Sequence, residues 1–268
     1  MNDQLSAPSR SSWPIALVIA LLACAGLIVG IKQLHRTADT TPVSAPVPVH
    51  LGKLTASTTD TRLHRVPIDH DQRMAPNGTV VHPRHTTALF DSPSGHPFAK
   101  VRPKEFGPTW LPVIAHAGGW LRVLLPSRPD GSTGWLQASK VRSATTPYQI
   151  QVHLATRTLD LFKDDNEIGT WSVAVGAPST PTPTGRTFLL GQLVDDNQTF
   201  SPVILPLGTH SRTLDSFGGG PGTVAIHGWT DPSVFGQAVS HGCIRVPADA
   251  LDRLRLIPLG TPVLITRT

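Results

Sequence analysis

Proline and glycine recur along the whole chain, and their frequency limits how much long helix it can form. The sequence has 26 prolines and 23 glycines among 268 residues, well above average usage. In a helix interior proline costs about 3 kcal/mol and glycine about 1 kcal/mol relative to alanine. Only 15% of the residues are charged, which further disfavours a coiled coil or a helical bundle. We therefore expect a mostly β fold built from short strands and Pro/Gly turns.

One apolar run near the N-terminus departs from this pattern. Residues 13–31 read WPIALVIALLACAGLIVGI and contain no charged side chain, and a run of about 20 apolar residues spans the hydrocarbon core of a bilayer. We expect an uncleaved transmembrane helix here, preceded by a cytoplasmic N-terminal segment over 1–12. Two cleaved alternatives stay open. LLAC at 21–24 resembles a lipoprotein box with its lipid on Cys24, and ACA at 23–25 resembles an ordinary signal-peptide site.

The next segments differ in composition, which suggests domain boundaries. Residues 32–73 are rich in Pro, Thr and Ser and show little periodicity, which predicts an extended stalk. Residues 74–146 alternate apolar and polar positions around Gly turns, as antiparallel strands do. Within them, GGWLRVLLP and GWLQASKV resemble a bacterial SH3-like module, and the resemblance implies a small β-barrel. That family often binds wall polymers or packs against a catalytic domain.

Residues 147–268 predict a second β-rich domain with one or two short helices. YQIQVH at 148–153 alternates strictly between apolar and polar residues, and VAIHG and TPVLIT add further strands. The segment from Pro247 to about Leu256 predicts a helix, because proline suits a first helical turn and Asp249 complements the helix dipole. The Gly-rich run at 218–222 lacks the Lys-Ser/Thr of a phosphate loop and is expected to be a loop beside a cleft.

The segment from His227 to Arg245 is the one most suggestive of chemistry. Cys243 is followed by no other cysteine, and His241 and His227 precede it by 2 and 16 residues. A thiolate is a strong nucleophile, and a nearby histidine can take the thiol proton and lower the thiol pKa by forming an ion pair. Gly242 beside the thiol would let a substrate carbonyl approach backbone N–H groups that hold an oxyanion.

The same residues could also have purely structural roles. Cys243 could be a small buried apolar residue, and His227 a core histidine on a strand. A zinc site made by His227, His241 and Cys243 is disfavoured because a fourth ligand at motif spacing is missing. We expect no metal and no organic cofactor.

The wider pattern resembles a known family. His227 followed by Ser-His-Gly-Cys-Ile-Arg at 240–245, together with TPTGRTF at 182–188, resembles the signature of L,D-transpeptidases with a YkuD-type catalytic domain. The resemblance covers about 148–267. It implies an enzyme whose thiol acylates on the third residue of a peptidoglycan tetrapeptide stem and expels the terminal D-Ala.

The resemblance also implies a role for each motif residue. Cys243 matches the nucleophile and His227 the general base, with the Gly228 carbonyl orienting that base. The remaining matches concern the oxyanion site and the substrate: the N–H groups of Gly242 and Cys243, His241 near the oxyanion site, Ser240 at the start of the motif, and Arg245. The Arg245 guanidinium would suit a substrate carboxylate, and a structural salt bridge is the equal alternative.

These observations together predict a membrane-anchored peptidoglycan L,D-transpeptidase, with its catalytic domain on the wall side of the membrane. It would transfer the acyl group to an amine of a neighbouring stem peptide or protein. Two rivals stay open, an L,D-carboxypeptidase that uses water as acceptor and a non-catalytic wall-binding protein. A net charge of +5 without any run of five Lys/Arg residues gives no reason to expect nucleic acid as a partner.

Overall fold

The computed structural model describes residues 49–73 and 75–268. The predicted membrane helix at 13–31, the N-terminal segment 1–12 and the alternative lipid attachment at Cys24 lie outside the described residues and stay predictions. Within the described part, no helix combines the length and the apolar character needed to cross a membrane. The expected wall-side location is likewise still a prediction.

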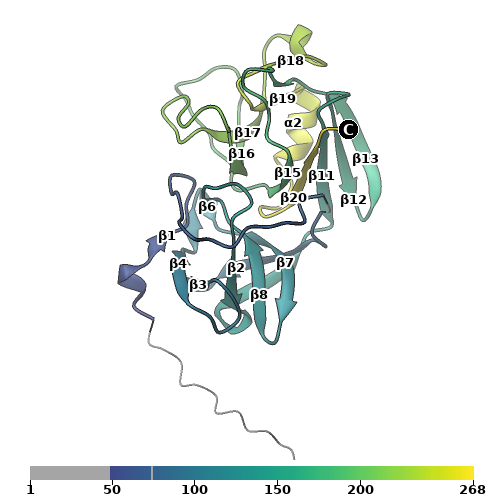
Figure 1. The fold of residues 1–268 in the computed structure, drawn as a ribbon. Helices are drawn as coiled ribbons and strands as arrows, with labels where there is room; N and C mark the ends of the chain where they lie inside the picture. The colour runs from purple at the N-terminus through teal and green to yellow at the C-terminus, as the bar shows by residue number, and fades with distance from the viewer. Residues whose placement is uncertain (1–48, 74) are drawn as a thin grey trace, which may run out of the picture. The chain divides into compact units, whose positions relative to one another are not determined.

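The first half of the described chain, residues 49–146, is built almost wholly of strands, and we call it the β module (Figure 1). Eight of its strands form one sheet in the order β1-β4-β3-β9-β8-β7-β2-β10, while β5 and β6 pair separately. Its SH3-like character is not established by this arrangement and stays a prediction. The elements are η1 (Leu51–Lys53), β1 (Thr55–Ala56), β2 (Thr79–Pro83), β3 (Thr87–Phe90), β4 (Pro97–Val101), β5 (Lys104–Glu105), β6 (Gly107–Pro108), β7 (Leu111–Ala117), β8 (Trp120–Leu124), β9 (Thr133–Gln137), η2 (Ala138–Lys140) and β10 (Val141–Thr145).

The second half, residues 147–268, adds three further sheets and a short helix, which makes the described chain mostly β as expected. The sheets run β13-β12-β11-β20-β15, β16-β17-β19 and β14-β18. The elements are β11 (Tyr148–His153), β12 (Thr158–Lys163), β13 (Asn166–Ser172), β14 (Val175–Gly176), β15 (Gly185–Phe188), β16 (Ile204–His210), β17 (Thr223–Gly228), η3 (Pro232–Val234), β18 (Ala238–Ser240), β19 (Ile244–Val246), α2 (Ala248–Leu254) and β20 (Pro262–Thr266).

Helix α2 forms where the sequence predicts it and packs into the core of the second half. Pro247 is its N-cap and Asp249 lies in its first turn. Ala250, Leu251 and Leu254 are buried with side chains from β11, β20, β16 and β17, so the helix fills the space between two sheets (Figure 1). Burying one leucine in this way contributes about 1.5–3 kcal/mol.

The two halves are joined by apolar and charged contacts within one unit, residues 49–268. Phe188 of β15 is fully buried in the core of the β module, whereas the next residue, Leu189, belongs to the core of the second half. Arg186 also lies on β15, and its guanidinium forms a buried ion pair with Asp69. Strand β15 therefore ties both cores together.

Residues 49–73 differ from the extended stalk that we predicted over 32–73. Thr55 pairs with Ala99 in a parallel bridge between β1 and β4, Leu63 is buried in the core of the β module, and Asp69 binds Arg186. The stalk prediction is wrong for these residues, because single apolar and charged side chains at irregular spacing anchor them. Such anchors leave no periodicity in the sequence.

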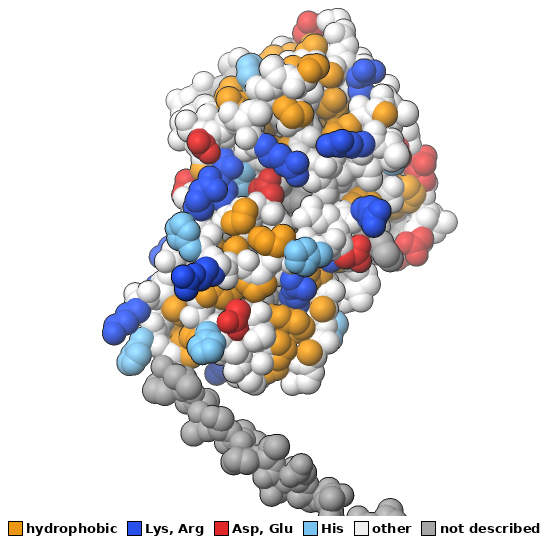
Figure 2. All heavy atoms as spheres, in the orientation of Figure 1, with side chains coloured by type: hydrophobic (Ala, Val, Ile, Leu, Met, Phe, Trp, Pro, Cys, Tyr) orange, Lys and Arg blue, Asp and Glu red, His pale blue; other side chains and the backbone are white. Residues whose placement is uncertain are grey.

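Charged side chains are distributed over the visible surface without a single basic stripe. Figure 2 shows Lys and Arg side chains spread over this face and interspersed with acidic and apolar ones. Attraction to an anionic polymer would therefore act over the whole face rather than at one patch.

Candidate active site

Two parallel strands bring the predicted catalytic residues together. β17 pairs with β19, and His227 lies opposite Arg245. Cys243 directly precedes β19, so this register sets it beside the strand that carries His227. Parallel neighbours require a crossover connection, and here the chain leaves the sheet through η3 and β18 before it returns.

His227 is buried, with 7% of the residue exposed, and its orientation is fixed by its neighbour along the chain. Nδ1 lies 2.7 Å from the Gly228 carbonyl oxygen. Because a carbonyl only accepts hydrogen bonds, Nδ1 carries the proton and Nε2 keeps its lone pair. Burial, assisted by the Arg245 charge, lowers the pKa of His227 to about 4 despite the Gly228 hydrogen bond. The imidazole is therefore a neutral base at neutral pH.

Aromatic side chains enclose this base. The ring of Phe200 packs edge-on to the imidazole with centroids 4.9 Å apart, and the Trp229 ring lies 6.0 Å away. Phe200 and Trp229 also contact each other at 5.5 Å. This apolar wall supplies the desolvation that keeps His227 uncharged.

A buried hydroxyl holds Gly228, whose carbonyl fixes the orientation of the His227 ring. The Gly228 N–H donates to Ser201 Oγ at 2.8 Å, and Ser201 Oγ donates to the Val203 carbonyl at 2.6 Å. A Cβ at position 228 would lie 3.2 Å from Ser201 Oγ and 3.3 Å from Leu251 Cδ2. The close approach of these side chains explains why glycine occupies this position.

The Cys243 thiol differs from the ion pair that we predicted. Burial raises the pKa of the thiol, and a backbone hydrogen bond from Ala225 and the positive charge of Arg245 offset this only in part. The same desolvation lowers the pKa of His227. Two groups buried together in this way favour their neutral forms, so the resting site holds a thiol and a neutral imidazole rather than a thiolate and an imidazolium.

The loop before Cys243 is fixed by two hydroxyl groups. Ser240 Oγ accepts a hydrogen bond from the Gly242 N–H at 3.1 Å and donates to the Cys243 carbonyl at 2.5 Å. Thr182 Oγ1 donates to the Gly242 carbonyl and accepts from the Gly176 N–H, both at 2.8 Å. These bonds hold Gly242 at φ +117°, a conformation that favours glycine.

One predicted oxyanion donor is already engaged by this arrangement. The Gly242 N–H is bound to Ser240 Oγ, so it is not available in the resting site, in contrast to our prediction. Across residues 49–73 and 75–268, the Cys243 N–H has no hydrogen-bond partner. The structure therefore leaves the Cys243 amide as the motif donor that can meet a developing negative charge.

His241 lies at the rim of the site rather than beside the base. Its side chain is exposed, and its ring stacks on Phe217 with centroids 5.0 Å apart and planes at 29°. His227, by contrast, is enclosed by Phe200 and Trp229. The zinc alternative is not supported, because the described residues contain no group of three or more His, Cys, Asp or Glu that could hold a metal ion.

Arg245 projects a partly buried guanidinium over the indole of Trp229, with Cζ 3.6 Å from the ring centroid. Desolvation lowers the pKa of Arg245, with the thiol acting in the opposite direction. The ion pairs between described residues do not include Arg245, and its buried Nε lacks a hydrogen-bond partner among them. The structure thus does not support the structural salt bridge that we considered.

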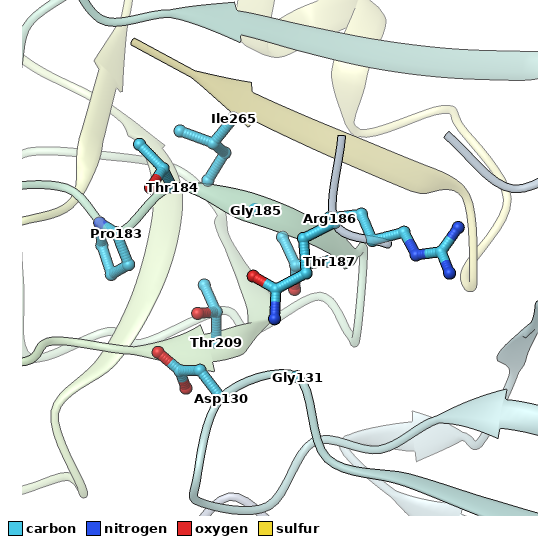
Figure 3. A pocket seen from close by; sticks show the side chains of 10 residues that line it. Asp130, Gly131, Pro183, Thr184, Gly185, Arg186, Thr187, Thr209 and Ile265 are labelled. Carbon is cyan, nitrogen blue, oxygen red and sulfur yellow. The ribbon is translucent and has the colours of Figure 1, made fainter. Parts of the chain in front are cut away.

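A separate small hollow lies between the β module and β15. It is lined by residues that include Gln72, Asp130 and the stretch 183–187, while the Arg186 side chain points away from it (Figure 3). Its free space is about 10 Å³, about what one water molecule needs. None of the predicted site residues lines it, so it is not the reaction site.

Several contributors to the site were not predicted from the sequence. Thr182 belongs to the TPTGRTF stretch that supports the family resemblance. The motif therefore pointed to this residue, but its hydrogen bonds to Gly176 and Gly242 were not predicted. Phe200, Ser201 and Phe217 lie in loops without a motif. They reach the site only through the pairing of β16 with β17 and its connecting loops.

Comparison with known proteins finds relatives of the second half of the chain. The YkuD family, described as the L,D-transpeptidase catalytic domain, matches residues 147–265. A Bacillus licheniformis protein named as L,D-transpeptidase YkuD is 35% identical over 153 residues, which cover 54% of this chain and 86% of that protein. Its Bacillus subtilis namesake is 32% identical over 124 residues, covering 46% and 68%.

Among solved structures, an L,D-transpeptidase from Mycobacterium tuberculosis H37Rv is 17% identical, with a TM-score of 0.38. The match covers 52% of this chain and 73% of that one. The sequence relatives carry the assignment, since the Bacillus licheniformis protein is matched over most of its length at 35% identity. On the grounds of these relatives and of the matched catalytic domain, the chain belongs to the L,D-transpeptidase family with a YkuD-type catalytic domain.

Proposed function

We propose that this chain is a peptidoglycan L,D-transpeptidase that works through an acyl-enzyme on Cys243. The donor is a tetrapeptide stem, and the acceptor is an amine of a neighbouring stem peptide or protein. Family membership supports the reaction class. The observation that carries the assignment of roles is the buried His227, whose Nδ1–H is bound to the Gly228 carbonyl so that Nε2 is the free base.

In the first half-reaction, Cys243 Sγ attacks the carbonyl carbon of the third stem residue while His227 Nε2 takes the thiol proton. The negative charge that develops on the carbonyl oxygen is stabilised by the Cys243 N–H. The intermediate collapses when the C–N bond to D-Ala breaks, and His227 returns the proton to the departing amine. A thioester and free D-Ala result, and the Gly228 carbonyl stabilises the transient imidazolium through Nδ1–H.

In the second half-reaction, the acceptor amine attacks the thioester carbonyl and His227 Nε2 takes a proton from its nitrogen. The C–S bond breaks, the new amide forms, and the proton returns to Sγ. Because the thiol and the imidazole begin and end neutral, no charged pair has to be buried in the resting enzyme. This is consistent with the pKa directions of the two groups.

The choice between amine and water as acceptor is tested by product analysis. The full chain is incubated with a tetrapeptide donor, with and without an acceptor peptide that carries a free amine, and the products are separated by chromatography. We expect a crosslinked product in place of the tripeptide when the acceptor is present. Release of tripeptide alone, unaffected by acceptor, would identify a carboxypeptidase. Absence of any turnover would favour the non-catalytic rival.

We further propose that Arg245 binds a carboxylate of the donor stem. Its guanidinium is held against Trp229 and has no acidic partner among the described residues. A hydrogen bond to a charged group contributes about 1.5–3 kcal/mol. A partly buried arginine without an anion gains that energy only when a ligand supplies the charge.

The Arg245→Gln variant should therefore raise KM for the donor by roughly 10- to 100-fold, with a smaller change in kcat. Arg253 offers a matched control, since it also lies over a tryptophan, Trp171 at 5.7 Å, but on the exposed side of α2. We expect Arg253→Gln to leave KM unchanged. A KM for Arg245→Gln within about twofold of wild type would contradict carboxylate binding.

A further inference from the structure

The loop between β16 and β17, residues 211–222, connects the β module to the site. At its neck the Ser211 N–H donates to the Gly222 carbonyl at 2.8 Å. At its tip Phe217 and Gly220 exchange two backbone hydrogen bonds of 3.0 Å. The loop is thus closed at both ends, and a displacement of the neck would move the tip.

Arg128 of the β module holds the neck of this loop. Its guanidinium donates to three carbonyl oxygens of the 211–222 loop, those of Ser211 at 3.1 Å, Leu214 at 3.2 Å and Pro221 at 2.9 Å. A planar guanidinium can bind several acceptors in a fixed geometry, which lysine cannot do. Arg128 is itself fixed, because its backbone N–H and carbonyl bond to Thr61 and Leu63.

The tip of the same loop touches the catalytic motif. Phe217 stacks on His241, two residues before Cys243. Although phenylalanine is usually buried, 52% of Phe217 is exposed. An aromatic ring that packs on one side against the loop carrying Cys243 and is open on the other offers an apolar surface to a peptide that approaches the thiol.

We propose that Arg128 is a positioning residue for the reaction, through which the β module fixes the 211–222 loop so that Phe217 and His241 form one wall of the stem-peptide site. This inference rests on the proposed function for the identity of the substrate. It assigns the β module a part in binding the peptide. Without Arg128, the ordering of the loop has to be supplied by substrate binding, which weakens the apparent affinity.

The test compares Arg128→Gln with Phe217→Ala and with the double variant. Each single variant should raise KM for the donor by about tenfold, with kcat changed by less than about threefold. The double variant should be no worse than the poorer single variant, because both changes remove the same wall. The control is Arg62→Gln, which breaks an exposed 3.7 Å contact to Asp215 on the same loop and is expected to have no effect.

A second measurement needs no turnover and so separates this inference from the proposed function. The ring protons of ¹³C-labelled His241 sense the stacked Phe217, and we expect their NMR shifts to change in Arg128→Gln and not in Arg62→Gln. If Arg128→Gln fails to fold, Arg128→Lys takes its place, since it keeps the charge and loses the planar donors. Unchanged His241 shifts would overturn the inference, as would an unchanged KM or multiplicative effects in the double variant. If the wild-type protein shows no turnover while the His241 shifts do change in Arg128→Gln, the result contradicts the proposed function and not this inference.

Discussion

Replacing Cys243 with alanine is expected to lower donor turnover by at least about 10⁴-fold, because loss of a covalent nucleophile removes the reaction path itself. Cys243 is the free cysteine of the described residues, and the other cysteine, Cys24, lies in the apolar N-terminal run. Alanine removes the thiol and with it the backbone hydrogen bond that the sulfur receives from Ala225. Since a typical hydrogen bond contributes only about 1 kcal/mol, the unfolding temperature should fall by no more than a few degrees. Turnover is measured as D-Ala release from the tetrapeptide donor.

The matched control for this variant is Cys243→Ser, which keeps the shape of the side chain and a proton for His227 but is a poorer nucleophile. It should also be nearly inactive, with a normal unfolding temperature. Retention of more than a few per cent of wild-type turnover by folded Cys243→Ala would rule out covalent catalysis at this residue.

Replacing His227 with alanine should have the second-largest effect, a loss of about 10²- to 10⁴-fold in turnover at neutral pH. The thiol has a raised pKa, so without the base most of it stays protonated. The deficit should narrow as the pH rises, because hydroxide then generates the thiolate directly. The measurement is D-Ala release by wild type and variant across a pH series.

The decrease of wild-type kcat/KM at low pH provides a direct check on the protonation state of His227. The pKa of His227 is lowered to about 4, so the imidazole remains unprotonated at pH values where an ordinary histidine, with a pKa of about 6.5, is charged. The rate constant kcat/KM should therefore fall only as the pH approaches about 4. A fall centred on the ordinary histidine pKa would contradict the buried, neutral base.

Alkylation of Cys243 by iodoacetamide separates the two histidines of the motif, because it measures the reactivity of the thiol without substrate positioning. We expect slower alkylation in His227→Ala and little change in His241→Ala, since the His241 ring stacks on Phe217 at the rim. Donor turnover should fall in both variants. If alkylation slows equally in the two variants, the experiment does not support different roles for the two histidines. If it slows more in His241→Ala than in His227→Ala, His241 is the base.

The sequence was most informative where a local residue pattern determines the secondary structure. Strict alternation at 148–153 predicts β11, and Pro247 with Asp249 predicts α2. Cys243 and His227 could be singled out because the segment from His227 to Arg245 resembles the L,D-transpeptidase signature, whereas residue types and spacing alone left their roles open. The parallel pairing of β17 with β19, which sets Cys243 beside the strand that carries His227, was not predicted from the sequence.

Features that depend on distant contacts were beyond sequence reasoning. Ser201 fixes Gly228 from 27 residues away, and a lone serine in a loop gives no sign of such a role. The protonation states of Cys243 and His227 depend on burial by surrounding side chains, which only the folded chain specifies. Segment 49–73 was misassigned for a related reason, because isolated anchors such as Leu63 do not produce a pattern.

Intact mass spectrometry of the full chain, mixed with the tetrapeptide donor in the absence of acceptor, tests the central claim most directly. We predict a mass increase equal to the donor less one D-Ala, mapped by peptide digestion to Cys243 and absent from Cys243→Ala. Product formation with no such adduct, or an adduct that maps to another residue, would contradict it.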